Sequence, residues 1–185
     1  PCIVAPPVWM GLAEHHVAFG GTFTLSLPVW HAVLRELCQS ILRAGFKKIV
    51  LVNSHGGNMA ALNALTVDLS REVGVPIATT TLYSIAHETG AYASILEDQK
   101  QVMHACEAET AMMMVAAPDC VRHDKINEAV GPSMTAGAAL SRAIHTWKSF
   151  TELTPTGVIG DARKATPAKG EKLLDTAAQS IADRL

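Results

Sequence analysis

The chain has 185 residues, of which 49% are hydrophobic and 17% charged, so its composition is that of a folded domain and not of a disordered chain. Its formal net charge is -2 and its aromatic content is 5%, and neither value favours nucleic acid or an anionic membrane as a partner. No apolar run reaches the ~18 residues of a membrane span, and no charged leader precedes an apolar stretch at the start, so we expect neither a span nor a signal peptide.

The cysteines lack the CxxC spacing of metal and redox motifs and indicate reduced thiols, which predicts a cytoplasmic protein. They are Cys2, Cys38, Cys106 and Cys120. The mean hydropathy of +0.21 is high for a monomer and favours a homo-oligomer that buries some surface between subunits.

The first part of the chain predicts a strand, a loop and a helix. Residues 1–8 are apolar and predict the start of a buried strand, broken by Pro6-Pro7. After a loop over 11–21, apolar residues at helical spacing predict a helix that has Pro28 in its first turn and ends at Gly45.

The middle of the chain predicts a parallel sheet. Residues 48–52 predict a strand buried on both faces, and residues 75–83 predict another strand, rich in Val, Ile and Thr. A helix that stops at Gly74 lies between them. This alternation predicts an α/β fold around a mainly parallel sheet, and no linker or repeat divides it, so we predict a single domain over 1–185.

The last part of the chain predicts two helices around a long irregular segment. A Met-rich helix is expected over 107–117, before Pro118. Residues 118–165 are expected to be mostly loop, with a further helix near 136–147. The final helix is expected to begin at Thr166-Pro167, where a cap residue precedes a first-turn proline.

The first candidate site is the turn that follows the strand over 48–52. Ligands of parallel α/β sheets bind at the carboxyl ends of the strands, and His55 lies just past such an end. Gly56 and Gly57 allow a ligand to approach closely, while Asn53 and Asn58 can tie the turn with side-chain hydrogen bonds. We therefore predict His55 as a metal ligand or a proton shuttle, and Gly56, Gly57 and Asn58 as substrate-binding residues; a structural turn with an exposed histidine is the alternative.

The second candidate site is the segment from His104 to Glu109. In one continuous helix these two side chains would point about 140° apart, so both reach one site only if the segment before Glu107 is a loop. We expect that arrangement, with Glu109 in the first helical turn, where its charge suits the helix dipole. The alternative is that Glu107 and Glu109 only cap a helix.

The third candidate site is the segment Glu14-His15-His16. Neighbouring side chains point in opposite directions in an extended chain, so we expect that one histidine at most, His16, enters a cleft. A solvated polar loop is the alternative.

Together these segments resemble the creatininase (creatinine amidohydrolase-like) family. The motifs are Asn53-Ser54-His55-Gly56-Gly57-Asn58, then His104-Ala105-Cys106-Glu107-Ala108-Glu109-Thr110, with Glu14-His15-His16 and Phe19-Gly20-Gly21-Thr22 before them and Gly157-Val158-Ile159-Gly160-Asp161 near the end. Their order and spacing fit the family over essentially the whole chain.

The resemblance implies a three-layer α/β/α sandwich, a site with two divalent metals, hydrolysis of a non-peptide C–N bond, commonly in a cyclic amide, and often a hexamer. It implies that His55 binds one metal and Glu109 the other, that His104 donates a proton to the leaving nitrogen, and that Glu107 assists acid–base work or binds metal. His16 would line the pocket.

The chain departs from the family pattern mainly at its start. The family has an earlier strand with a Glu-x-His…Asp motif that supplies three metal ligands, and this motif does not precede Pro1 here. We therefore expect the domain to be incomplete at its N-terminus. Smaller departures are Gly20 in place of a usual Pro, Cys106 in place of Gly and Ala111 in place of Ser.

The functional hypothesis is a metal-dependent amidohydrolase that uses Zn, Mn or Fe to activate water against a small-molecule substrate. Two alternatives stay open: a catalytically inactive or incomplete subunit with a structural role, and a metal-dependent lactone or ring-ketone hydrolase.

Overall fold

The structure is a computed structural model that describes residues 2–133 and 146–185. The chain divides into two compact units, residues 1–81 and 82–185, and each has its own hydrophobic core. The helix expected near 136–147 falls almost entirely outside the described residues. Within the described ranges, no helix combines the length and the apolar character needed to cross a bilayer.

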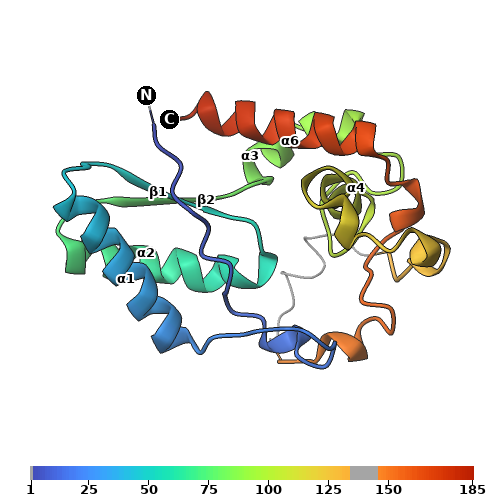
Figure 1. The fold of residues 1–185 in the computed structure, drawn as a ribbon, viewed down its shortest axis with the longest axis horizontal. Coiled ribbons are helices and arrows are strands. Elements are labelled where there is room, and N and C mark those ends of the chain that lie inside the picture. Colours follow the sequence, from blue (N-terminus) through green and yellow to red (C-terminus); the bar gives the residue numbers. More distant parts are fainter. Residues whose placement is uncertain (1, 134–145) are drawn as a thin grey trace. The chain divides into compact units, whose positions relative to one another are not determined.

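The unit of residues 1–81 contains a pair of parallel strands, β1 (Ile49–Asn53) and β2 (Ile77–Thr81), which pair along their whole length. α2 (Met59–Val73) connects them, and α1 (Leu27–Arg43) precedes β1. Figure 1 shows both helices on the same side of the strand pair. The parallel pairing and the connecting helix are those predicted from the alternation of strand and helix patterns.

Local signals explain the ends of these elements. Pro28 lies in the first turn of α1, and Gly74 ends α2 with a left-handed φ of 78° that a glycine adopts without strain. The core between helices and strands is formed by buried residues of all four elements: Trp30, Leu34, Cys38, Ile49, Leu62, Leu65, Leu69 and Ile77.

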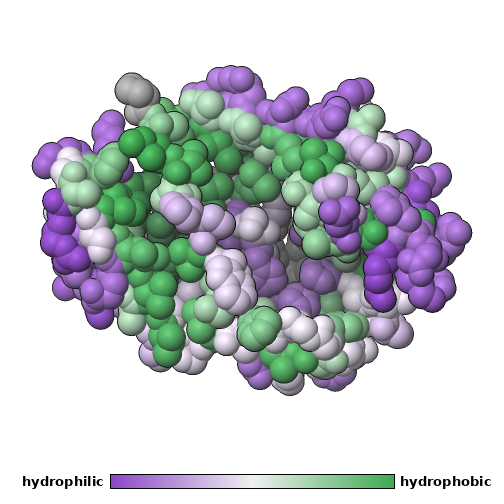
Figure 2. All heavy atoms as spheres, viewed as in Figure 1, coloured by the Kyte–Doolittle hydropathy of each residue, from purple (hydrophilic) through white to green (hydrophobic). Residues whose placement is uncertain are grey.

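Two predictions about this unit are wrong. The strand over 48–52 is not buried on both faces, because the helices cover one face and Val52 remains 51% exposed. Residues 2–9 form no strand, and Val4 is 90% exposed. Figure 2 shows apolar atoms gathered on the face of this unit over which the segment runs. Pro6-Pro7 explains the missing strand in part, since neither residue has an N–H for a ladder.

The unit of residues 82–185 is mainly helical. Its longer helices are α4 (Glu107–Ala116) and α6 (Pro167–Ala182), which lie side by side in Figure 1, and α3 (Ser84–Glu88) is a short one. A side chain at Gly170 would overlap the Ala111 carbonyl oxygen, so a glycine is needed where the two long helices meet.

The predicted start of α6 is confirmed, including the Thr166 side chain that accepts a hydrogen bond from the N–H of Lys169, and α4 has its predicted bounds to within one residue. The described part of 118–165 is irregular, as expected, with short 3-10 turns. These turns are Pro118–Cys120, His123–Glu128, Phe150–Glu152 and Ala162–Lys164.

The core of residues 1–81 predicts a contrast between two positions of α2. Leu69 is fully buried, whereas Val67 is 60% exposed on the same helix. We expect Leu69→Ala to lower the free energy of unfolding by about 2–5 kcal/mol, because it removes buried methyl groups and leaves a cavity. Val67→Ala should change it by less than about 0.5 kcal/mol. Urea denaturation of both variants checks this, and equal effects would contradict the assigned core.

Candidate functional site

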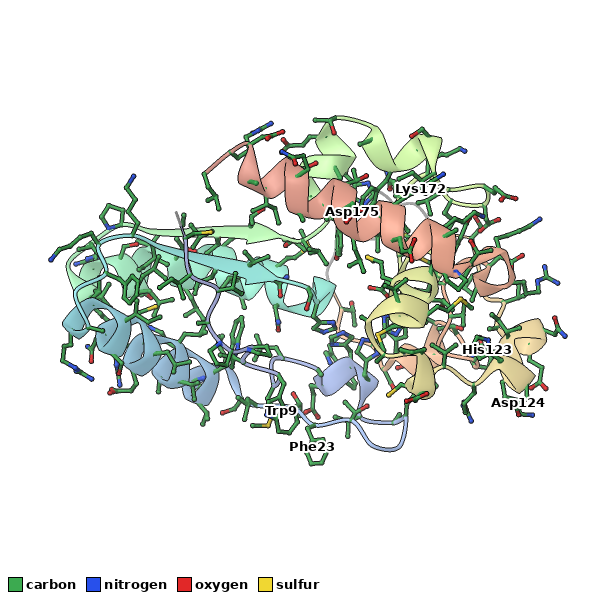
Figure 3. All side chains as sticks on the ribbon, turned by 45° about the horizontal axis from the view of Figure 1, so that its top comes forward. Trp9, Phe23, His123, Asp124, Lys172 and Asp175 are labelled. Carbon is green, nitrogen blue, oxygen red and sulfur yellow. The ribbon has the colours of Figure 1, made fainter. Side chains whose placement is uncertain are left out.

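The loop that carries His15 and His16 is closed at its base by several contacts. Trp9 and Phe23, labelled in Figure 3, meet edge to face with ring centroids 5.8 Å apart. The N–H of Ala13 donates to the Thr24 hydroxyl at 2.9 Å, while Leu25 N–H donates to the Gly11 carbonyl, also at 2.9 Å. The loop therefore has a defined conformation within the unit of residues 1–81.

Inside this loop, Glu14–His16 forms a short 3-10 turn. The rings of His15 and His16 lie close together as a result, with centroids 4.0 Å apart. The prediction that one histidine at most faces a site is wrong, because it assumed an extended chain. His15 is thus a candidate residue that the sequence reasoning missed.

The turn after β1 is tied by its two asparagines, as predicted. The Asn53 amide donates to the His55 carbonyl at 2.8 Å, and its oxygen accepts the N–H of His55 at 3.2 Å. Asn58 donates to the Asn53 oxygen at 3.1 Å and accepts the N–H of Leu12 at 2.9 Å. Asn58 therefore joins the strand end to the histidine loop, and its role as a substrate contact stays a prediction.

These tethers bring His15, His16 and His55 together. One ring nitrogen of each lies within 4.8 Å of those of the other two. Nε2 of His55 is buried and makes no hydrogen bond among the described residues, so a strong acceptor is left without a partner. Three imidazoles with an unsatisfied nitrogen fit a divalent transition metal, for which imidazole is a preferred ligand.

Burial favours the neutral form of two of these rings. Burial lowers the pKa of His55, although a hydrogen bond to the Leu12 backbone opposes this shift. Burial also lowers the pKa of His15, and the neighbouring His55 lowers it further. A neutral imidazole offers a nitrogen lone pair to a metal, and a backbone hydrogen bond on the other nitrogen fixes the ring that presents it.

Gly57 has no side chain, and the histidine rings occupy the space beside its backbone. A side-chain carbon there would overlap the rings of both His15 and His55. The groups that approach this glycine closely are imidazoles of the chain itself, and the close approach of a ligand stays a prediction. Gly56 begins the adjoining 3-10 turn and is exposed. Substrate contacts of Gly56 and Gly57 stay predictions.

The unit of residues 82–185 holds the second site. α4 begins at Glu107, and Ala105 before it has a φ of 46°, so His104 lies in a loop and Glu109 in the first helical turn, as predicted. The N–H of Ala105 donates to Oε2 of Glu109 at 2.7 Å. Nδ1 of His104 is 4.0 Å from the same oxygen. The loop therefore turns both side chains toward each other.

Neighbouring groups orient this pair. The ring of Phe150 meets the His104 ring edge to face at 4.5 Å, and the His104 carbonyl accepts the N–H of Ile159 at 2.8 Å. Burial raises the pKa of Glu109 to about 7, although the hydrogen bond from the Ala105 N–H lowers this pKa in part. Burial, followed by the charge of Glu109, raises the pKa of Tyr83 to about 12, so Tyr83 stays protonated beside the carboxylate.

Glu107 has very different surroundings from Glu109. It is fully buried, and its carboxylate accepts the N–H groups of Glu97 and Asp98, the latter at 2.8 Å. Nζ of Lys169 lies 2.6 Å from Oε1 of Glu107 and 2.6 Å from a Glu97 carboxylate oxygen. These contacts give Glu107 a structural role between α4, α6 and the 97–98 segment. Its predicted acid–base or metal role stays a prediction.

The predicted residues thus form two groups. His16 and His55 lie together with His15 in the first unit, and His104 and Glu109 lie together in the second. A centre shared by His55 and Glu109 stays a prediction.

Comparison with known proteins identifies the family of this chain. The creatininase family profile, described as creatinine amidohydrolase, matches residues 1–185. The chain belongs to the creatininase family. Mycofactocin precursor peptide peptidases of Mycolicibacterium smegmatis and Mycobacterium ulcerans are 28% and 25% identical to it, over 99% and 92% of this chain. The chain spans 66% and 60% of their lengths.

Solved structures confirm the creatininase-like α/β fold. A candidate creatinine amidohydrolase from Bacteroides fragilis matches with a TM-score of 0.79 and 24% identity, over 99% of this chain and 70% of that one. A mutant creatininase complexed with creatine matches with a TM-score of 0.71 and 18% identity, over 94% and 71%. A manganese form and a zinc form of creatininase match at 20% and 21% identity, with TM-scores of 0.65 and 0.63, each over 90% of this chain and 66% of that one.

The glycine beside the imidazoles gives a prediction for this candidate metal site. We expect Gly57→Ala to weaken zinc binding by about tenfold or more, because the added methyl group pushes His15 and His55 apart. Gly20→Ala is the matched control, since a side-chain carbon there meets no atom within 4 Å. Calorimetric zinc titration of both variants checks this, and unchanged affinity in Gly57→Ala would argue against zinc between these rings.

The buried carboxylate gives a second prediction. Lys169→Met should lower the free energy of unfolding by about 3–5 kcal/mol, because it leaves the Glu107 charge buried without its cation. Lys164→Met is the control, since that side chain is exposed and only its carbonyl contacts Lys169. In Glu107→Gln/Lys169→Met part of the loss should be recovered. Urea denaturation measures all three, and a near-neutral Lys169→Met would rule out the structural role.

Proposed function

We propose that this chain is part of a metal-dependent hydrolase that cleaves an amide C–N bond with an activated water. The observation that carries the proposal is the buried Nε2 of His55, which has no hydrogen-bond partner among the residues that the structure describes and lies among the ligand atoms of His15 and His16. A divalent cation bound there would polarise a carbonyl group and lower the pKa of water toward about 7.

In this proposal the residues of the first unit bind the metal ion and orient its ligands. His15, His16 and His55 offer three nitrogens, and the low pKa values of His15 and His55 favour the neutral, metal-binding form. Nitrogen ligands of this kind suit Zn, Mn or Fe. Asn53 and Asn58 hold the His55 backbone and the histidine loop in place, so the ligand geometry is preorganised.

In this proposal the residues of the second unit donate the proton that the leaving group needs. When the C–N bond breaks, the leaving nitrogen needs a proton, and an imidazolium is a suitable donor near neutral pH. In this proposal His104 gives that proton to the leaving nitrogen. Oε2 of Glu109, 4.0 Å from Nδ1, stabilises the charged ring before transfer, and the contact with the Phe150 ring restricts the orientation of the imidazole.

Two substrate classes are compatible with this chemistry. The curated relatives named as peptidases of a precursor peptide are 25–28% identical, which favours a peptide-type amide. A small cyclic amide is the second candidate, and the creatininase-like fold, shared with a creatininase that binds creatine, favours it. Comparing hydrolysis of a peptide panel and of creatinine by the same preparation separates the two.

His55→Ala tests the metal assignment. We expect the purified protein to carry stoichiometric metal by elemental analysis, and the His55→Ala variant to carry none and to lose hydrolysis, since the change removes the unpartnered buried nitrogen. His123→Ala is the control, because that histidine is exposed and lies outside the cluster.

The result also decides between the alternatives. Normal metal content and rate in His55→Ala would defeat the assignment of the metal to this histidine. A parent protein that takes up no metal would instead favour a structural subunit. Metal-dependent cleavage of lactones, without cleavage of amides, would favour the ester-type hydrolase.

A further inference from the structure

A cavity of about 380 Å³ adjoins the acid–base pair in the unit of residues 82–185. Glu109 and Thr110 of α4 form part of its wall, and the segment that follows α4 forms another part. This volume lies within the range of small-molecule ligand sites, about 300–1,000 Å³. A molecule in this cavity would therefore contact Glu109 directly.

The cavity also has two cationic residues, Arg122 and Lys125. Lys125 forms an exposed ion pair with Glu128 at 3.2 Å, and such a pair contributes little to the stability of the fold. Arg122 has no ion-pair partner within the part of the chain that the structure describes. Asp124 is not among the lining residues, and it is exposed, as is His123. The guanidinium of Arg122 is thus available to a ligand.

The other lining residues are mostly apolar. Met113, Val121 and Ile126 provide surface for an aliphatic or aromatic group of a ligand. The cavity therefore combines three chemical properties: an acidic group at Glu109, a cationic group at Arg122, and apolar surface. An amino-acid residue with a free α-carboxylate matches this combination, because guanidinium binds carboxylate through two parallel hydrogen bonds.

The two charges also give the ligand a direction. The carboxylate of Glu109 repels a second carboxylate, while Arg122 attracts it, so a terminal carboxylate is placed toward Arg122. The amide nitrogen on the other side of the residue is then nearer to Glu109, whose Oε2 lies 4.0 Å from Nδ1 of His104. This direction is the one that proton transfer to a leaving nitrogen requires.

We propose that this cavity is a subsite for the C-terminal residue of a peptide or peptide-like amide, with its free α-carboxylate bound by Arg122. Lys125 adds long-range attraction, and Met113, Val121 and Ile126 contact the side chain. The proposal rests on the proposed hydrolase function, since it names the substrate end that this hydrolase recognises. It makes Arg122 a specificity-determining residue.

The test is a binding experiment that needs no turnover. N-acetyl-alanyl-leucine and its C-terminal amide are titrated into the protein as purified and followed by NMR. We expect the free acid to bind about tenfold or more tightly than the amide, as a charge-assisted hydrogen bond implies. Arg122→Ala should remove this difference by weakening the acid alone, and Arg122→Lys should restore part of it.

Arg71→Ala is the matched control, because Arg71 is exposed on α2 in the other unit. Equal affinity of acid and amide for the parent protein, no detectable binding of the acid, or an equal loss of both probes in Arg122→Ala would each overturn the subsite. These results are independent of the metal experiment. Equal cleavage of acid and amide would leave the hydrolase proposal intact, whereas loss of metal dependence would defeat that proposal alone.

Discussion

The side chain of Asn58 is the contact on which the candidate metal centre depends. It is buried, it donates to Asn53 at the end of β1, and it accepts the N–H of Leu12 at the start of the histidine loop. One amide thus links two segments that are 46 positions apart in the chain. This link acts together with the hydrogen bond between His55 and the Leu12 backbone, and both segments need such contacts because they are irregular.

The grouping of three imidazoles has an electrostatic consequence. Burial disfavours the charged form of His15 and of His55 and lowers both pKa values, and repulsion from the neighbouring His55 lowers the pKa of His15 further. The neutral rings still leave the buried Nε2 of His55 unsatisfied. A cation on these nitrogens would bind the lone pairs of the neutral rings. It would also supply the partner that Nε2 of His55 lacks among the described residues.

The sequence predicts the features of this fold that depend on local chemistry. Gly74 and the pair Thr166-Pro167 mark helix ends because they impose backbone conformations by themselves. The exposure of residues 2–9 was not predictable, because burial depends on what packs against a segment. His15 was missed since the 3-10 turn has no clear sequence signal. The contact of Glu107 with Lys169 joins residues 62 positions apart, and such pairing cannot be found from local patterns.

The two glutamates of α4 show how one helical turn separates structural and chemical roles. Glu107 and Glu109 are two residues apart, so their side chains leave the helix about 200° apart. Glu107 points into the protein, where backbone N–H groups and Lys169 compensate its charge. Glu109 lines the cavity, and its carboxylate accepts the N–H of Ala105. Burial raises the pKa of Glu109 to about 7. The fixed glutamate thus anchors the helix start, and the less compensated one is suited to proton chemistry.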